Sequence, residues 1–211
     1  MKRLAVLGAS GHGRVVADAA LASGWQEIVF FDVRWPELIA LGPWKVVGDD
    51  ARLLASGAEF DGVVVAIGAN RLRLERFRAL TAAGAKMVTI AHPAAIVSRF
   101  ASVGVGSVLC AGAIVSPFAI IGTASIINTA ATIDHDCTLA DGVHVSPGAH
   151  LGGAVQVGEA SWIGLGAAVR QGIIIGSDVV VGVGAAVVSA VGDALTVAGV
   201  PARTLNIDSR K

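Results

Sequence analysis

The chain has 211 residues, of which 54% are hydrophobic and 15% charged, and 16 basic residues balance 16 acidic ones. Because nucleic-acid binding depends on clustered Lys and Arg, this neutral balance argues against a nucleic-acid-binding protein. The length allows one large domain or two small ones, each with its own hydrophobic core.

The first third of the chain alternates between two kinds of segment. Short apolar runs predict strands at 3–7, 27–31, 61–67 and 86–90, and the stretches between them predict helices at 14–23, 50–55 and 71–83. Asn70 is placed to cap the last helix. Strands alternating with helices favour a small α/β, Rossmann-like domain with a parallel sheet, over residues 1–90.

A glycine-containing loop, Gly8-Ala9-Ser10-Gly11-His12-Gly13, follows the first predicted strand. Backbone N–H groups at such a helix start bind phosphate and other anions. The spacing differs from Gly-x-Gly-x-x-Gly, so it does not indicate NAD. Asp32 ends the second strand, where a carboxylate can bond a ribose or a base. The segment Gly68-Ala69-Asn70 follows the third strand and reaches the same edge. The alternative is that these glycines only permit tight turns.

A six-residue period governs the rest of the chain. Val, Ile or Leu occupies sixteen consecutive positions at this spacing, from Val97 to Val187, and a small or β-branched residue follows four places after each. No insertion breaks the register over 97–192. Stacked turns that bury the aliphatic and the small residue explain this pattern. A hydropathy scan would take the uncharged stretch 100–133 for a membrane span, but its frequent glycines and hydroxyl residues argue against that.

Two histidines in the repeat are candidates for chemistry. Acyl transfer to an amine needs a base, and histidine serves near neutral pH. His135 is expected to point outward, and Asp134 and Asp136 flank it in a segment, 97–192, that holds only seven of the 32 charged residues. Neighbours on a strand face apart, so a contact between His135 and Asp136 requires a corner. An exposed turn histidine without function is the alternative. His144 follows nine residues later, one and a half hexads on, and is therefore expected to face a different side of the repeat from His135. A metal site is not expected, because Cys137 occupies an inward position.

Motifs from both halves resemble a known family. The loop at 8–13, Asn128-Thr129, His135-Asp136-Cys137, the segment 144–149 and the segment 199–203 are similar to those of the hexapeptide-repeat sugar acetyltransferases of the bacillosamine and perosamine N-acetyltransferase and sialic acid O-acetyltransferase group. This resemblance implies a left-handed parallel β-helix of roughly five coils over 91–196, a C-terminal tail at 197–211, and a homotrimer.

The resemblance also assigns roles to residues. It makes His135 the catalytic base and Asp136 the acid that tunes it. The residues implied to bind the nucleotide sugar are Ser10, Gly11, His12 and Asp32. Gly68 and Asn70 are expected to join them as substrate-binding residues, because their segment reaches the same edge of the sheet. Those implied to bind acetyl-CoA are His144, Gly164, Leu165, Val183 and Gly184, with Arg203 as a further phosphate partner. Relatives that bind uracil have two adjacent acids where this chain has Asp32-Val33, so the base stays open between UDP and GDP.

These observations predict an acetyl-CoA-dependent N-acetyltransferase that acts on the 4-amino group of a UDP- or GDP-linked amino-deoxy sugar. Its expected partners are that sugar, acetyl-CoA and its own copies, without metal, nucleic acid or a membrane span. Two cysteines and no apparent signal peptide favour the cytoplasm. The alternatives are a sialic-acid-type O-acetyltransferase and a non-catalytic, nucleotide-binding β-helix scaffold.

Overall fold

The computed structural model describes residues 2–205 and opens with an α/β domain. One sheet has the order β3-β4-β2-β1-β5. Its strands are β1 (Arg3–Leu7), β2 (Glu27–Phe31), β3 (Ala40–Leu41), β4 (Trp44–Gly48) and β5 (Gly62–Val65), and its helices are α1 (Gly11–Ala22), α2 (Asp50–Ser56) and α3 (Asn70–Ala82), with a 3-10 turn at Gly57–Glu59. All pairs are parallel except the β3–β4 hairpin.

Both faces of this sheet are covered. Leu4 and Val6 pack on the side of α1, whereas Ala5 and Leu7 pack on the side of α2 and α3. Alternate residues of one strand thus enter two separate hydrophobic clusters, as a strand buried on both faces must. The predicted α/β domain is confirmed.

Two local predictions differ from the structure, and one hairpin was not predicted. Asn70 is the first residue of α3, and the helix is capped by Ala69 instead. The segment 86–90 adds only the bridge between Val63 and Met87 to the sheet, because the chain is already leaving for the next domain. The hairpin of β3 and β4 was not predicted; β3 has two residues, too few to produce a period.

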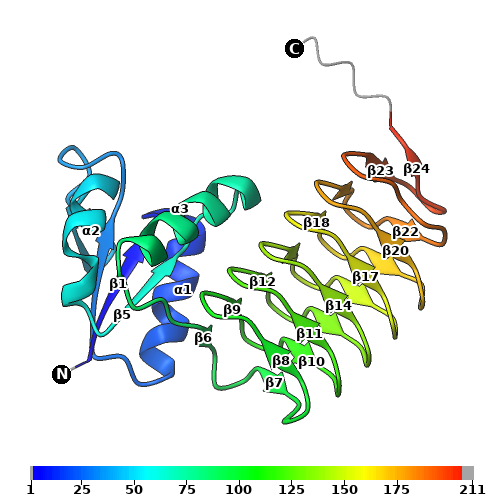
Figure 1. The fold of residues 1–211 in the computed structure, drawn as a ribbon, viewed down its shortest axis with the longest axis horizontal. Coiled ribbons are helices and arrows are strands. Elements are labelled where there is room, and N and C mark those ends of the chain that lie inside the picture. Colours follow the sequence, from blue (N-terminus) through cyan, green and yellow to red (C-terminus); the bar gives the residue numbers. More distant parts are fainter. Residues whose placement is uncertain (1, 206–211) are drawn as a thin grey trace.

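From Ile90 to Val187, short parallel strands recur every six residues and stack into three flat faces (Figure 1). The first face holds β7 (Ile96–Val97), β10 (Ile114–Val115), β13 (Thr132–Ile133), β16 (His150–Leu151), β19 (Ala168–Val169) and β22 (Ala186–Val187). The second holds β8 (Ser102–Val103), β11 (Ile120–Ile121), β14 (Thr138–Leu139), β17 (Gln156–Val157) and β20 (Ile174–Ile175). The third holds β6 (Ile90–Ala91), β9 (Val108–Leu109), β12 (Ile126–Ile127), β15 (His144–Val145), β18 (Trp162–Ile163), β21 (Val180–Val181), β23 (Thr196–Ala198) and β24 (Arg203–Thr204).

The prism has three corners, each named here for one residue in its turns. The His135 corner joins the first face to the second, the Glu159 corner joins the second to the third, and the Gly164 corner joins the third back to the first. Each strand pairs with the strand three hexads further along the chain, as Thr132 does with His150. In a triangular section the His135 corner therefore lies opposite the third face.

The hexads fill the prism as predicted. The second residue of nearly every strand is buried, and so are most of the small residues at the corners, in one continuous cluster. The left-handed β-helix is confirmed, and the uncharged stretch 100–133 forms its early coils. No helix in the described part of the chain is long and apolar enough to span a membrane. The strands of the β-helix start at β6, and its third face continues to β24. The domain boundaries at residues 91 and 197 therefore stay a prediction.

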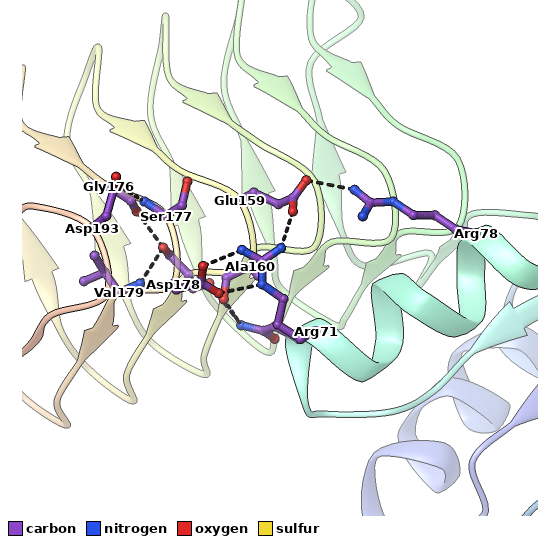
Figure 2. Close-up of polar contacts among 11 residues, drawn as sticks. Arg71, Arg78, Glu159, Ala160, Gly176, Ser177, Asp178, Val179 and Asp193 are labelled. Atoms are coloured by element: carbon purple, nitrogen blue, oxygen red, sulfur yellow. Dashed lines mark hydrogen bonds and ion pairs between the residues drawn. The ribbon is translucent and has the colours of Figure 1, made fainter. Parts of the chain in front are cut away.

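The α/β domain rests on the third face and on the Glu159 corner. Residues of α1 share a hydrophobic cluster with Val108 and Cys110 of the first coils. Arg71 of α3 forms ion pairs with Glu159 and Asp178, and Arg78 bonds Glu159 at 2.8 Å (Figure 2). Two surfaces of the prism are thus covered or bordered by the domain, and the His135 corner is not among them.

Candidate active site

A cavity of about 220 Å³ opens at the carboxyl edge of the parallel sheet. Its walls include Ser10 after β1, Asp32 after β2 and Gly68 after β5. Ser10 is the N-cap of α1, and its hydroxyl makes no capping bond, so the hydroxyl is available to a ligand. Ligands of open parallel sheets bind at this edge, and a helix start favours anions.

The glycines of the loop at 8–13 serve different purposes. Gly8 has φ +110°, and a Cβ on Gly13 would lie 2.3 Å from the Gly8 carbonyl oxygen. Tight packing therefore explains these two. A Cβ on Gly11 would meet nothing within 4 Å, so packing does not explain that glycine. Gly11 stands next to Ser10 at the start of α1, where backbone N–H groups are free.

Asp32 is already fully hydrogen-bonded. Its Oδ2 accepts from Ala9 N at 2.7 Å and from Arg34 Nη2 at 3.0 Å, and its Oδ1 accepts from Arg34 N at 3.1 Å and Nε at 2.7 Å. The hydrogen bond from Arg34 is the main cause that lowers the pKa of Asp32 to about 2. Burial raises this pKa, and the bond from Ala9 N lowers it further. A nucleobase that binds here meets the Asp32–Arg34 carboxylate–guanidinium pair rather than a free carboxylate.

His135 and Asp136 are the two turn residues of their corner. Asp136 has φ +60°, and this left-handed conformation lets neighbouring side chains meet, as the sequence required. His135 Nδ1 lies 2.7 Å from Asp136 Oδ2, and the His135 side chain is 59% exposed. The Asp136 bond, followed by the charge of Asp134, raises the pKa of His135. With the Nδ1 proton held by Asp136, the neutral ring leaves the Nε2 lone pair free.

Gly153, one coil later, packs against the imidazole ring of His135. A Cβ at this position would lie 2.6 Å from both Cε1 and Nε2 of His135, closer than real Cβ contacts. Only glycine therefore accommodates the ring in this position. Gly153 was not among the residues predicted from the sequence; its signal is a glycine placed one full coil after the histidine.

His144 lies buried on the third face in an aromatic stack. Its ring is parallel to that of Trp162 at 5.3 Å, and the ring of His12 lies 6.5 Å away on the other domain. Burial, and then the charge of Arg73, lowers the pKa of His144 to about 3 and that of His12 to about 4. Both rings are therefore neutral at physiological pH.

The hydrogen bonds of Asn128 fix the tautomer of His144. Thr129 N donates to Asn128 Oδ1 at 2.9 Å, so the Asn128 amide nitrogen faces His144 Nε2 at 3.1 Å and donates to it. The ring proton of His144 therefore sits on Nδ1, a buried donor without an acceptor among the described residues. Sequence reasoning assigned no role to Asn128.

An apolar groove of about 300 Å³ continues from Trp162 along the third face to the Gly164 corner. Gly164, Leu165 and Val183, three of the residues predicted to bind acetyl-CoA, line it, and Gly184 is the next residue in the same turn. Trp162 Nε1 donates to Ser146 Oγ at 2.6 Å and so fixes the indole at one end of the groove. Arg203 lies elsewhere, in a cavity at the last coils.

The remaining predicted residues separate. Gly68 lines the cavity, but the Asn70 side chain points to the Glu159 corner of the prism, where Nδ2 donates to Ala160 O at 2.9 Å. His12 projects from α1 toward His144 and is not part of the cavity wall. Among the described residues, no group of three His, Cys, Asp or Glu side chains is arranged to hold a metal ion.

Two sets of residues therefore occupy opposite sides of one prism. His12, His144, Trp162 and the groove follow one another along the third face, and the cavity lies in the α/β domain beside the start of α1, the helix that carries His12. His135 and Asp136 lie on the corner opposite that face, with the aliphatic core between them.

Comparisons with known proteins agree over the whole chain. The family model for the PglD N-terminal domain matches residues 3–80. The acetyltransferase domain of PglB from Neisseria gonorrhoeae FA1090, solved with acetyl coenzyme A, is 44% identical, with a TM-score of 0.93 over 97% of this chain and 99% of that one. A variant of perosamine N-acetyltransferase from Caulobacter crescentus, solved with CoA and GDP-perosamine, is 34% identical, with a TM-score of 0.93 over 98% of each chain. WeeI from Acinetobacter baumannii AYE is 26% identical, with a TM-score of 0.89 over 97% of this chain and 100% of that one. No curated protein matches the chain.

Proposed function

We propose that this chain, which belongs to the hexapeptide-repeat sugar N-acetyltransferases, transfers acetyl from acetyl-CoA to the 4-amino group of a UDP- or GDP-linked amino-deoxy sugar. The chain is an acyltransferase that uses acetyl-CoA and acts on nucleotide amino sugars, as the sequence predicted. We further propose that the 4-amino group of the sugar is the nucleophile, that His135 is the general base, and that two subunits form each site.

The observation that carries the proposal is the row of His12, His144, Trp162 and the groove along the third face, with the cavity at the start of the helix that carries His12. A nucleotide in the cavity at Ser10 points its sugar past His12, and a pantetheine arm in the groove at Leu165 brings its thioester to Trp162. The stacked rings of His144 and Trp162 would then stand between the acceptor sugar and the thioester. Two substrates held in this way react as if at high local concentration.

His135 is the proposed general base. Attack by the amine on the thioester forms the C–N bond and a tetrahedral intermediate, which then expels the CoA thiolate while the nitrogen gives up a proton. Nε2 of His135 accepts that proton, and Asp136 stabilises the resulting imidazolium through Nδ1. The raised pKa of His135 makes its ring a stronger base than a free imidazole.

His144 is the proposed donor to the thioester carbonyl. Its Nδ1–H has no acceptor of its own among the described residues, and the bond from Asn128 prevents the proton from moving to Nε2. A fixed donor in a water-poor site stabilises the developing oxyanion because it needs no reorganisation during the reaction. A backbone amide of the groove can supply a second donor.

The position of His135 requires a second copy of the chain. One prism cannot present its His135 corner to its own third face, so the base must come from a neighbour, as in the predicted homotrimer with three sites between subunits. The same corner carries Phe100 and Phe118, stacked at 5.8 Å and 63% and 62% exposed. Exposed aromatic pairs of this kind support contact with another subunit.

A direct test offers the protein acetyl-CoA with UDP-, GDP- and dTDP-linked 4-amino sugars and a sialic acid, and uses mass spectrometry to find which gains one acetyl group. Acetylation of one amino sugar by the wild type, and strongly reduced turnover by His135→Ala at unchanged assembly, is the expected result. Acetylation of the sialic acid alone would move the function to the O-acetyltransferase. Ligand binding without any acetylation would favour the scaffold.

A further inference from the structure

Arg73 is a buried cation on α3 without a carboxylate partner among the described residues. Its side chain is 1% exposed, and each of its nitrogens donates to an oxygen of the protein. The acceptors are the carbonyl oxygens of Ile67, Gly68, Ala124 and Gly142 and the Asn70 Oδ1, at 2.7 to 3.0 Å. An arginine that is satisfied only by neutral oxygens keeps its full charge in the interior.

Two of these acceptors belong to the wall of the nucleotide cavity. Ile67 and Gly68 line it, and both carbonyl oxygens accept from Arg73 Nη1, at 2.9 and 3.0 Å. In a trans peptide the N–H points opposite to the C=O. The N–H groups of Gly68 and Ala69 therefore point away from Arg73, and neither has a partner in the part of the chain that the structure describes.

The other acceptors belong to the Glu159 corner of the prism. Ala124 and Gly142 occupy equivalent places in successive coils, and Arg73 bonds both at 2.7 Å. Asn70, which accepts from Arg73, donates to Ala160 O in the third successive coil. One guanidinium thus ties the cavity wall to three coils of the β-helix.

The charged side chains among the described residues that line the cavity are all paired. Asp32 is paired with Arg34, and Arg76 pairs with Asp50 at 2.6 Å and with Glu75 at 2.7 Å. Desolvation lowers the pKa of Arg73 to about 10, which leaves it charged at neutral pH. Arg73 therefore places one positive charge behind the peptide wall, where a diphosphate in the cavity would meet it.

We infer that Arg73 is a positioning residue for the nucleotide diphosphate, one that turns two backbone N–H groups toward the cavity and holds that wall in register with the third face. The inference rests on the proposed function, because it takes the ligand of the cavity to be a nucleoside diphosphate group. Arg73 does not touch the reacting atoms; it sets where the acceptor sugar stands relative to His144.

The test compares three variants in calorimetric titrations with UDP, GDP and CoA. Arg73→Met is expected to weaken binding of whichever nucleotide the wild type binds by about tenfold or more, because two backbone donors lose their orientation, and to leave CoA binding unchanged. Arg73→Lys keeps the positive charge but loses the planar guanidinium with its several N–H donors. Its nucleotide affinity is therefore expected to lie between those of the wild type and Arg73→Met. Arg71→Ala is the matched control: it loosens the same helix from the same corner without touching the loop at 67–69, and is expected to bind nucleotide like the wild type.

The outcomes separate the two proposals. Wild-type nucleotide affinity in Arg73→Met, or an equal loss of nucleotide and CoA binding, would overturn the positioning role and leave a structural one. If Arg73→Met does not fold, Arg73→Lys decides, through a raised KM for the nucleotide sugar at an unchanged KM for acetyl-CoA. Failure of the wild type to bind UDP and GDP while it binds CoA would instead refute the proposed function.

Discussion

Replacing Gly153 by Ala tests whether the position of the His135 ring sets the rate. The new Cβ would stand 2.6 Å from Cε1 and Nε2 of His135, whereas ordinary contact begins at 3.4 Å. The ring must retreat by roughly 0.8 Å, and a displacement of about 1 Å at a reacting group costs on the order of a hundredfold in rate. The backbone of Gly153 is not left-handed, so alanine adds no conformational strain there.

The assay is steady-state acetyl transfer at saturating acetyl-CoA and acceptor. The Gly153→Ala variant is expected to lose about a hundredfold in kcat, with little change in either KM or in the melting temperature. Gly192→Ala is the control, because its Cβ would meet only Leu195 at 3.7 Å. Wild-type kcat in Gly153→Ala would show that the ring position seen here does not matter for catalysis.

Three further outcomes follow from the same geometry. The rate should fall as pH drops below the raised pKa of His135, because only the neutral ring accepts a proton. Asp136→Asn should shift this fall in rate to lower pH and reduce the maximal rate. An unshifted pH profile would contradict the tuning role of Asp136. Asn128→Ala should lower kcat by about tenfold or more at unchanged CoA affinity, measured by titration, because the His144 proton is no longer confined to Nδ1. Arg71→Ala should destabilise by no more than about 1 kcal/mol in urea unfolding, less at high salt, because its ion pairs are half-exposed; a larger, salt-independent loss would contradict this.

Much of the fold could be predicted because its signals are local. A hexad is complete within six residues, so the pattern predicts which side chains point inward even before the coils stack. The same reasoning predicted an outward His135 and the need for a corner at Asp136. The β3–β4 hairpin was not predictable in the same way, because a two-residue strand depends on its neighbour for hydrogen bonds.

The parts of the site that were missed depend on contacts between distant segments. Arg73 reads in sequence as one of several arginines on an amphipathic helix, and only docking against Ala124 and Gly142 buries it. Asn70 was expected at the substrate, but the same docking turns it toward the Glu159 corner of the prism. Gly153 supports His135 only because the next coil brings it directly against the ring.

The central claim is that each active site combines the His135 corner of one subunit with the third face of another. Its most direct test co-expresses two differently tagged variants, His135→Ala and the double variant His144→Ala with Trp162→Ala, and purifies the mixed assemblies. Each mixed trimer, whichever variant is in excess, has roughly one site in three that pairs an intact corner with an intact face, so about a third of wild-type activity should return. Mixed assemblies as inactive as either parent would contradict the account.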